Sequence, residues 1–167
     1  AAGLAKTSVT NPLHFDRALA IEFATAQDPD TQVWLLSQIL KNRHDNRYIR
    51  RTLKAAAASK EVGVRIDAAL LAAMLKDDAV LGELLDDKDP AVRAAAALDA
   101  GLAGIASRGD TLVEKLTDID TNVAGNAAAG LAYLDPDKYG PALPVEKVEG
   151  SRGCTAVEVS GDYLYVA

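Results

Sequence analysis

The stretch that decides the fold covers residues 84–98 and reads LLDDKDPAVRAAAAL. Its leucines suit the apolar end of a helix, and the acidic run after them is typical of a polar turn. A proline is tolerated in the first turn of a helix, so Pro90 indicates a helix start. The alanines after Arg93 favour continuation of that helix, because alanine has the highest helix propensity and occupies little volume. We therefore predict two helices here, joined by a short turn at Asp87-Lys88-Asp89.

The same pattern recurs along the chain, as a polar turn followed by a valine and then by small residues. It occurs at residues 28–33, 59–65, 87–93 and 118–123. Its valines are separated by 31, 28 and 31 residues: Val33, Val64, Val92 and Val123. The residue four positions after each valine is small: Ser37, Ala68, Ala96 and Ala127. A period of roughly 30 residues fits two short helices and two turns, the unit of an α-solenoid.

This frame assigns two helices to each unit. The first helices are predicted at 31–41, 61–75, 90–106 and 120–133, and the second at 46–58, 78–86, 110–117 and 137–142. An opening helix over 13–26 would cap the exposed end of the stack. Asp30 and Asp120 precede their helices and are predicted as N-caps, because a carboxylate can accept a hydrogen bond from the free N–H groups of the first turn.

The stretch over residues 84–98 resembles the HEAT-type repeat, whose turn carries an aspartate and whose next helix opens with Val-Arg. In such families the turn aspartate and the helix arginine of neighbouring units form a ladder, and Asp87, Arg65 and Arg93 match those positions. The pattern weakens outward, because Trp34 and Ala124 stand where the arginine would be. The resemblance covers about residues 13–143. It implies a mainly α fold, a HEAT-like α-solenoid of about four two-helix units in a domain of residues 1–143.

The last stretch, residues 144–167, departs from the helical pattern and is predicted to be a linker followed by two strands at 155–159 and 163–166. Residues 157–167 resemble the opening of a blade in LVIVD-type β-propeller repeats of bacterial surface proteins. The segment is therefore either the start of a second domain or a hairpin packed on the helices. A lone hairpin leaves edges unpaired, so we expect strand addition by the continuing chain, a second copy or another subunit. The residues expected to take part are Val157, Val159, Tyr163, Tyr165 and Val166.

Composition narrows the function classes. The chain has 167 residues, of which 49% are hydrophobic, so it is long enough to build its own core. Its net charge of −6 disfavours generic binding to nucleic acid or to an anionic membrane. No apolar stretch approaches the roughly 18 residues of a membrane span. We therefore expect a protein partner, with no nucleic acid partner and no membrane span.

The cysteine count and the first residues bear on the compartment. Cys154 is the single cysteine, which excludes an internal disulfide and a four-cysteine zinc site. The chain begins Ala1-Ala2-Gly3 without methionine, as expected of an excised piece or of a mature protein whose signal peptide was removed. On this basis we expect a secreted, periplasmic or cell-surface location.

Residues that could carry catalysis are few. His14 and His44 are the only histidines, and neither lies in a metal-binding spacing. Cys154 follows a glycine with no histidine nearby in sequence, so an unactivated thiol is expected. Residues 118–122 match the first ligand positions of a calcium loop, but the required glycine is Val123. No phosphate-binding glycine loop occurs. We therefore predict no catalytic residue, no metal and no cofactor.

One concentrated basic feature stands out on this acidic chain. Its members are spaced by three and four residues and would share one side of a helix: Arg43, Arg47, Arg50, Arg51 and Lys54. Together with Trp34 they form the predicted partner-binding site, suited to an acidic segment or a phosphate group. The alternative is a solvated helix face neutralised by Asp28, Asp30 and Asp45.

These observations lead to one hypothesis and two alternatives. The first is a non-enzymatic protein–protein interaction or scaffold module, since solenoids present long binding faces without catalytic residues. The second is the N-terminal helical module of a larger secreted or cell-surface β-propeller protein. The third is a HEAT-like enzyme of the lyase or glycosylase kind, for which no residue in the sequence provides support.

Overall fold

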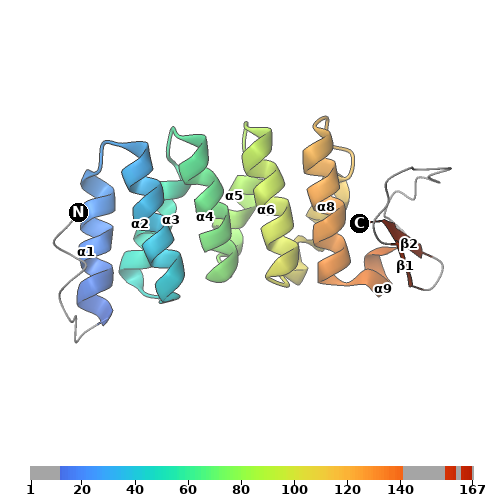
Figure 1. Cartoon of the computed structure of the whole chain (residues 1–167), viewed down its shortest axis with the longest axis horizontal. Helices are drawn as coiled ribbons and strands as arrows, with labels where there is room; N and C mark the ends of the chain where they lie inside the picture. The colour runs from blue at the N-terminus through green and yellow to red at the C-terminus, as the bar shows by residue number, and fades with distance from the viewer. Residues whose placement is uncertain (1–11, 141–156, 161–162, 167) are drawn as a thin grey trace.

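The computed structural model describes residues 12–140, 157–160 and 163–166, and this part of the chain is mainly helical (Figure 1). The helices are α1 (Pro12–Thr25), α2 (Pro29–Asn42), α3 (Arg47–Ala57), α4 (Val62–Met74), α5 (Asp78–Leu85), α6 (Pro90–Leu102), the 3₁₀ turn η2 (Ala106–Arg108), α7 (Gly109–Lys115), α8 (Thr121–Leu134) and α9 (Pro136–Tyr139). The mainly α prediction is thereby confirmed.

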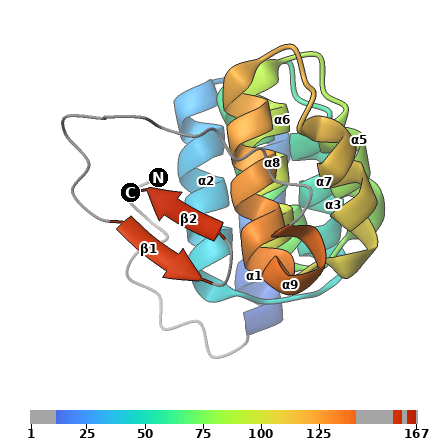
Figure 2. The same cartoon turned by 90° about the vertical axis from the view of Figure 1, so that its right-hand side faces the viewer.

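The helices form two layers. One layer is a row in which α2 packs on α4, α4 on α6, and α6 on α8 (Figure 1). The shorter helices α3, α5 and α7 lie in the second layer (Figure 2). Helix α3 packs on α1 and α4, α5 on α4 and α6, and α7 on α6 and α8. Helix α1 packs on both α2 and α3 at the first end of the stack.

Aspartates cap three of the four helices of the row, and Glu61 precedes α4 without a side-chain cap. Asp28, Asp89 and Asp120 each accept a backbone N–H from the first turn of the helix that follows. The prediction for Asp120 is confirmed, and Pro90 occupies the first turn of α6 as expected. The prediction for Asp30 is wrong. Asp28 caps α2, since Pro29 already lies within the first turn and the Asp28 carboxylate accepts the Thr31 N–H at 2.9 Å.

Helix α6 ends at Leu102, four residues before the predicted end. Gly104 adopts the left-handed conformation, with φ of 65°. Its N–H donates to Gly101 O at 2.9 Å, and the Ile105 N–H donates to Ala100 O at 3.0 Å. These two bonds form a Schellman motif, which satisfies the last carbonyls of the helix and reverses the chain.

Small residues let the helices of the row approach closely. Ala68, Ala96 and Ala127 are fully buried. Between α6 and α8 the backbones themselves meet, because a Cβ at Gly101 would collide with the backbone of Gly130. Leucines and isoleucines fill the space between the layers, among them Leu36, Leu53, Leu81, Leu84, Leu85 and Leu112. The core is therefore a seam of alanine and glycine within the row and of larger side chains between the layers.

Two short strands follow, β1 (Val157–Ser160) and β2 (Tyr163–Val166). They pair antiparallel, with Val157 opposite Val166 and Ser160 opposite Tyr163. The boundary expected between residues 143 and 144 lies outside the described residues. So do the side chains of the predicted strand-addition residues (Val157, Val159, Tyr163, Tyr165 and Val166), and strand addition stays a prediction.

Candidate functional site

The predicted ladder residues lie between neighbouring members of the helix row. The Arg65 Nε and Nη2 atoms donate to the two carboxylate oxygens of Asp87 at 2.7 and 3.0 Å. Its Nη1 atom donates to the carbonyls of Ser59 and Lys60 at 3.0 and 3.1 Å. One buried guanidinium thus ties the turn before its own helix to the turn before the next helix.

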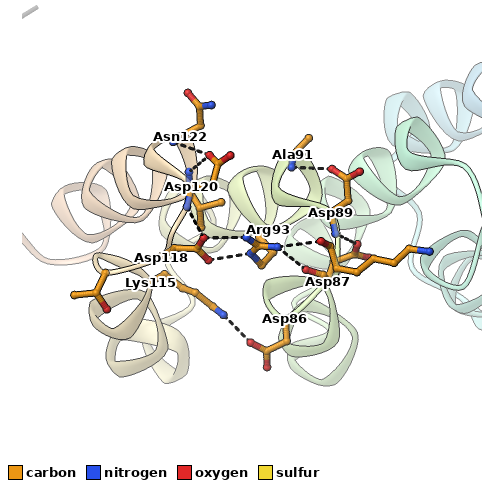
Figure 3. Close-up of polar contacts among 12 residues, drawn as sticks. Asp86, Asp87, Asp89, Ala91, Arg93, Lys115, Asp118, Asp120 and Asn122 are labelled. Carbon is orange, nitrogen blue, oxygen red and sulfur yellow. Dashed lines mark hydrogen bonds and ion pairs between the residues drawn. The ribbon is translucent and has the colours of Figure 1, made fainter.

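The next step repeats this arrangement one unit further along (Figure 3). Arg93 donates to both carboxylate oxygens of Asp118 at 2.9 Å and to the carbonyls of Asp87 and Lys88 at 2.9 and 3.3 Å. Asp118 is therefore a ladder residue that sequence reasoning missed. The signal was available, since Asp118 follows Asp87 by the same 31 residues that separate Val92 from Val123.

The ladder controls the ionisation of its carboxylates. Burial opposes the charge on Asp87, but hydrogen bonds from Arg65 and from the Asp89 N–H outweigh it and hold the pKa of Asp87 below its ordinary value. The hydrogen bond from Arg93 likewise lowers the pKa of Asp118. The guanidinium groups of Arg65 and Arg93 and the carboxylates of Asp87 and Asp118 are all paired within the chain, so the ladder is a structural device that joins successive turns.

The first unit uses glutamine in place of arginine. The N-caps Asp28 and Glu61 place Gln32, four residues after its cap, at the position of Arg65. The Gln32 side chain donates to Ala26 O at 3.0 Å, six residues back, as Arg65 does to Ser59 O. The prediction that Trp34 occupies the arginine position is wrong by two residues, because the valine spacing set the frame from Val33.

Helix α3 carries most of the predicted basic face, and the structure divides its cations into paired and unpaired groups. Arg50 donates to both carboxylate oxygens of Asp45 at 2.7 Å and to Asp77 at 3.3 Å. The hydrogen bond from Arg50 lowers the pKa of Asp45. Arg47 donates to the Tyr48 hydroxyl at 2.9 Å and lies over its ring. Neither Arg50 nor Arg47 is available without losing an internal contact.

The remaining predicted residues are scattered. Arg51 and Lys54 are exposed on α3, and the described residues give neither an acidic partner. Arg43 follows the end of α2 and lines a hollow at the C-terminal ends of α2, α4 and α6. Trp34 is 43% exposed on α2 and lines neither that hollow nor the groove between α1 and α3. The structure therefore does not bring the predicted partner site together as a single patch.

A groove between α1 and α3 brings two free cations together instead. Its volume is about 450 Å³, and Arg17 from α1 and Arg51 from α3 both line it. Neither guanidinium has an acidic partner among residues 12–140. Apolar side chains also line the groove, including Ile21, which is 53% exposed, and Phe23, which is 4% exposed. Sequence reasoning missed Arg17, because nothing local indicates that α1 packs beside α3.

A second polar cluster was also missed. The carboxylate of Asp16 is almost fully buried, with 1% of its surface exposed. It lies 2.9 Å from His44 Nδ1 and accepts Asn46 Nδ2 at 2.7 Å. Since Asn46 caps α3, this cluster fixes the turn between α2 and α3 against α1.

Three further properties bear on function: metal binding, membrane insertion and similarity to known proteins. Within residues 12–140, no group of three or more histidine, cysteine, aspartate or glutamate side chains could hold a metal ion. None of the described helices is long and apolar enough to span a membrane. No family model matches the chain, and a search of curated proteins finds no match.

Proposed function

We propose that this chain is a non-enzymatic protein-interaction module, built as a HEAT-like α-solenoid, that binds an acidic segment of a partner protein in the α1–α3 groove. The observation that carries the proposal is the pair of guanidinium groups of Arg17 and Arg51. They line one groove from two helices and have no acidic partner in the described part of the chain. The ladder of Arg65 and Arg93 supports the solenoid part of the proposal, because it repeats between successive units.

The chemistry of the groove defines the partner segment. Guanidinium groups bind carboxylates through paired, charge-assisted hydrogen bonds, which favours aspartate or glutamate on the partner. The exposed apolar surface of Ile21 favours apolar residues between those acids. A helix with acids on two edges of an apolar stripe satisfies both requirements. On a chain with a net charge of −6, the two unpaired guanidinium groups give this groove a local positive charge that attracts such a segment.

The test is a binding assay with a defined peptide. A synthetic helical peptide with glutamates flanking a leucine stripe is titrated with the full chain, and binding is followed by fluorescence anisotropy. The variant carries Arg17→Glu and Arg51→Glu, and the control carries Lys60→Glu and Lys88→Glu. Both variants change the net charge equally, but the control lysines lie in the turns before α4 and α6.

The expected result is a loss of roughly tenfold or more in affinity for the Arg17/Arg51 variant and little change for the control. The loss should shrink as salt is raised, because screening weakens charge pairing. Equal loss in both variants would reduce the effect to overall charge, and no loss in either would refute the groove.

A second proposal concerns residues 144–167, as the start of a further domain that follows a helical domain of residues 1–143. The pairing of β1 with β2 supports it, since a two-stranded sheet is marginal by itself. In this proposal the continuing chain, a second copy or another subunit adds a strand to the free edges of the β1–β2 sheet. Deleting residues 150–167 should leave the helical circular dichroism signal intact and abolish assembly, as measured by light scattering. A chain that is monomeric with and without the segment would refute strand addition.

A further inference from the structure

A hollow of about 390 Å³ opens across the C-terminal ends of α2, α4 and α6, which lie side by side (Figure 1). Much of its wall is apolar, formed by Leu70, Leu71, Met74 and Leu102. Leu70 and Leu102 remain 40% and 56% exposed, so apolar surface here is not yet buried. The volume falls in the range of small-molecule pockets. This hollow shares no residue with the α1–α3 groove.

Asp99, on α6, lies in this apolar hollow without a partner. Its carboxylate makes no hydrogen bond or ion pair within the part of the chain that the structure describes. Burial is the only cause that shifts its ionisation, and it raises the pKa of Asp99 to about 6. A carboxylate that is ionised at neutral pH in such a place is complementary to a positively charged group from outside the chain.

Two cations that line the hollow carry an independent signal. Arg43 and Lys76 follow the ends of α2 and α4 with φ of 53° and 50°, the only positive values among the described non-glycine residues. The corresponding residue after α6 is Gly104, which adopts this conformation without a steric cost. Arginine and lysine thus occupy two positions where the backbone conformation favours glycine, and both side chains line the hollow.

The histidine in the hollow is held in place rather than free. His44 lies 2.9 and 3.0 Å from the two carboxylate oxygens of Asp16, and Asn46 binds the same carboxylate. The Arg43 and Lys76 side chains, by contrast, have no acidic partner among the described residues. The hollow therefore presents one unpaired carboxylate, two unpaired cations and an apolar wall.

We propose that this hollow binds a small zwitterion with an apolar body, the chemical class of the hydrophobic amino acids. The ammonium group of the ligand would pair with Asp99, its carboxylate with Arg43 and Lys76, and its side chain would cover Leu70, Met74 and Leu102. A ligand of this kind offers a charge of opposite sign to all three unpaired groups and buries the exposed leucines. The site lies apart from the α1–α3 groove, so it goes beyond the proposed function.

The experiment uses two sets of closely matched probes with the full chain, and binding is measured by calorimetry. One set is L-phenylalanine, phenethylamine and 3-phenylpropanoate, and the other is L-leucine, isoamylamine and 4-methylpentanoate. Within each set, one compound carries both charges, one only the ammonium group and one only the carboxylate. The variants are Asp99→Asn and Lys76→Gly, the second of which also relieves the left-handed backbone. The controls are Glu83→Gln on α5 and Lys88→Ala in the turn before α6.

We expect at least one amino acid to bind about tenfold more tightly than either of its singly charged analogues. Asp99→Asn should weaken binding of the amino acid and the amine about tenfold and spare the carboxylate. Lys76→Gly should weaken binding of the amino acid and the carboxylate analogue and spare the amine. Both controls should bind all probes as the wild type does. No saturable binding of either amino acid, equal binding of the analogues, or unchanged binding by both site variants would overturn the proposal. Binding of the acidic peptide to the α1–α3 groove should be unaffected by either variant, which separates this test from that of the proposed function.

Discussion

Replacing Arg65 with methionine should destabilise the helical stack by about 3–5 kcal/mol. Methionine keeps much of the side-chain volume but removes the guanidinium, which is only 4% exposed. Asp87, 11% exposed, then keeps its hydrogen bond from the Asp89 N–H at 2.8 Å and loses both bonds from Arg65. The carbonyls of Ser59 and Lys60 lose a donor as well. Removing one partner of a buried ion pair typically costs about this much, because the other charge stays buried and uncompensated.

The assay is urea unfolding followed by circular dichroism at neutral pH, with Lys115→Met as the control. Lys115 also forms an ion pair, at 2.7 Å to Asp86, but Asp86 is 74% exposed, so the control should lose no more than about 1 kcal/mol. A loss for Arg65→Met as small as that of the control would refute the structural role of the ladder.

The pH dependence gives the same prediction a second check. The pKa of Asp87 in the folded chain lies below its ordinary value of 3.8, so its contribution to stability is present above that value. It is lost as the pH falls below about 3.8 through the lowered pKa. The stability difference between wild type and Arg65→Met should therefore shrink in that acidic window, and a difference that stayed constant there would argue against the Arg65–Asp87 pair.

Three further changes have defined outcomes. Ala96→Leu or Ala127→Leu should cost about 1–3 kcal/mol in urea unfolding, since both positions are fully buried between helices; an unchanged midpoint would contradict the packing. Asp99→Asn should stabilise the fold by about 1–2 kcal/mol at pH 7.5. Burial raises the pKa of Asp99 in the folded chain to about 6, so the wild type loses stability as the pH rises from 4 past 6 and the buried carboxyl becomes charged. That gain should vanish near pH 4, and a gain independent of pH would contradict the burial of the charge. Lys76→Gly should raise the unfolding free energy by about 0.5–1 kcal/mol by relieving a left-handed residue, and a loss would show that the side chain supports the fold.

The helices were largely predictable because their starts are chemically marked. Asp89 with Pro90 and Asp120 with its following turn carry capping signals that need no tertiary information. The two-residue error in the first unit has a local cause. Val33 imitates the repeat valine, whereas the helix start is set by Asp28 and Pro29.

The functional surfaces were predicted less well, because they depend on packing between helices. The run of cations on α3 was visible in the sequence, but whether Arg50 is free depends on Asp77, 27 residues away. Arg17 joins Arg51 only because α1 packs on α3. Asp99 shows no local peculiarity at all; its burial arises from the neighbouring helices.

The most direct test of the proposed partner binding is to map the acidic peptide on the chain by nuclear magnetic resonance. The ¹⁵N-labelled full chain is titrated with the peptide, and the shifts of the backbone amides are followed to saturation. We predict that the largest changes fall on α1 and α3, around Arg17, Ile21, Arg51 and Ala55, with little change in α6 and α8. Changes centred on α6 and α8, or no saturable change at all, would contradict the account.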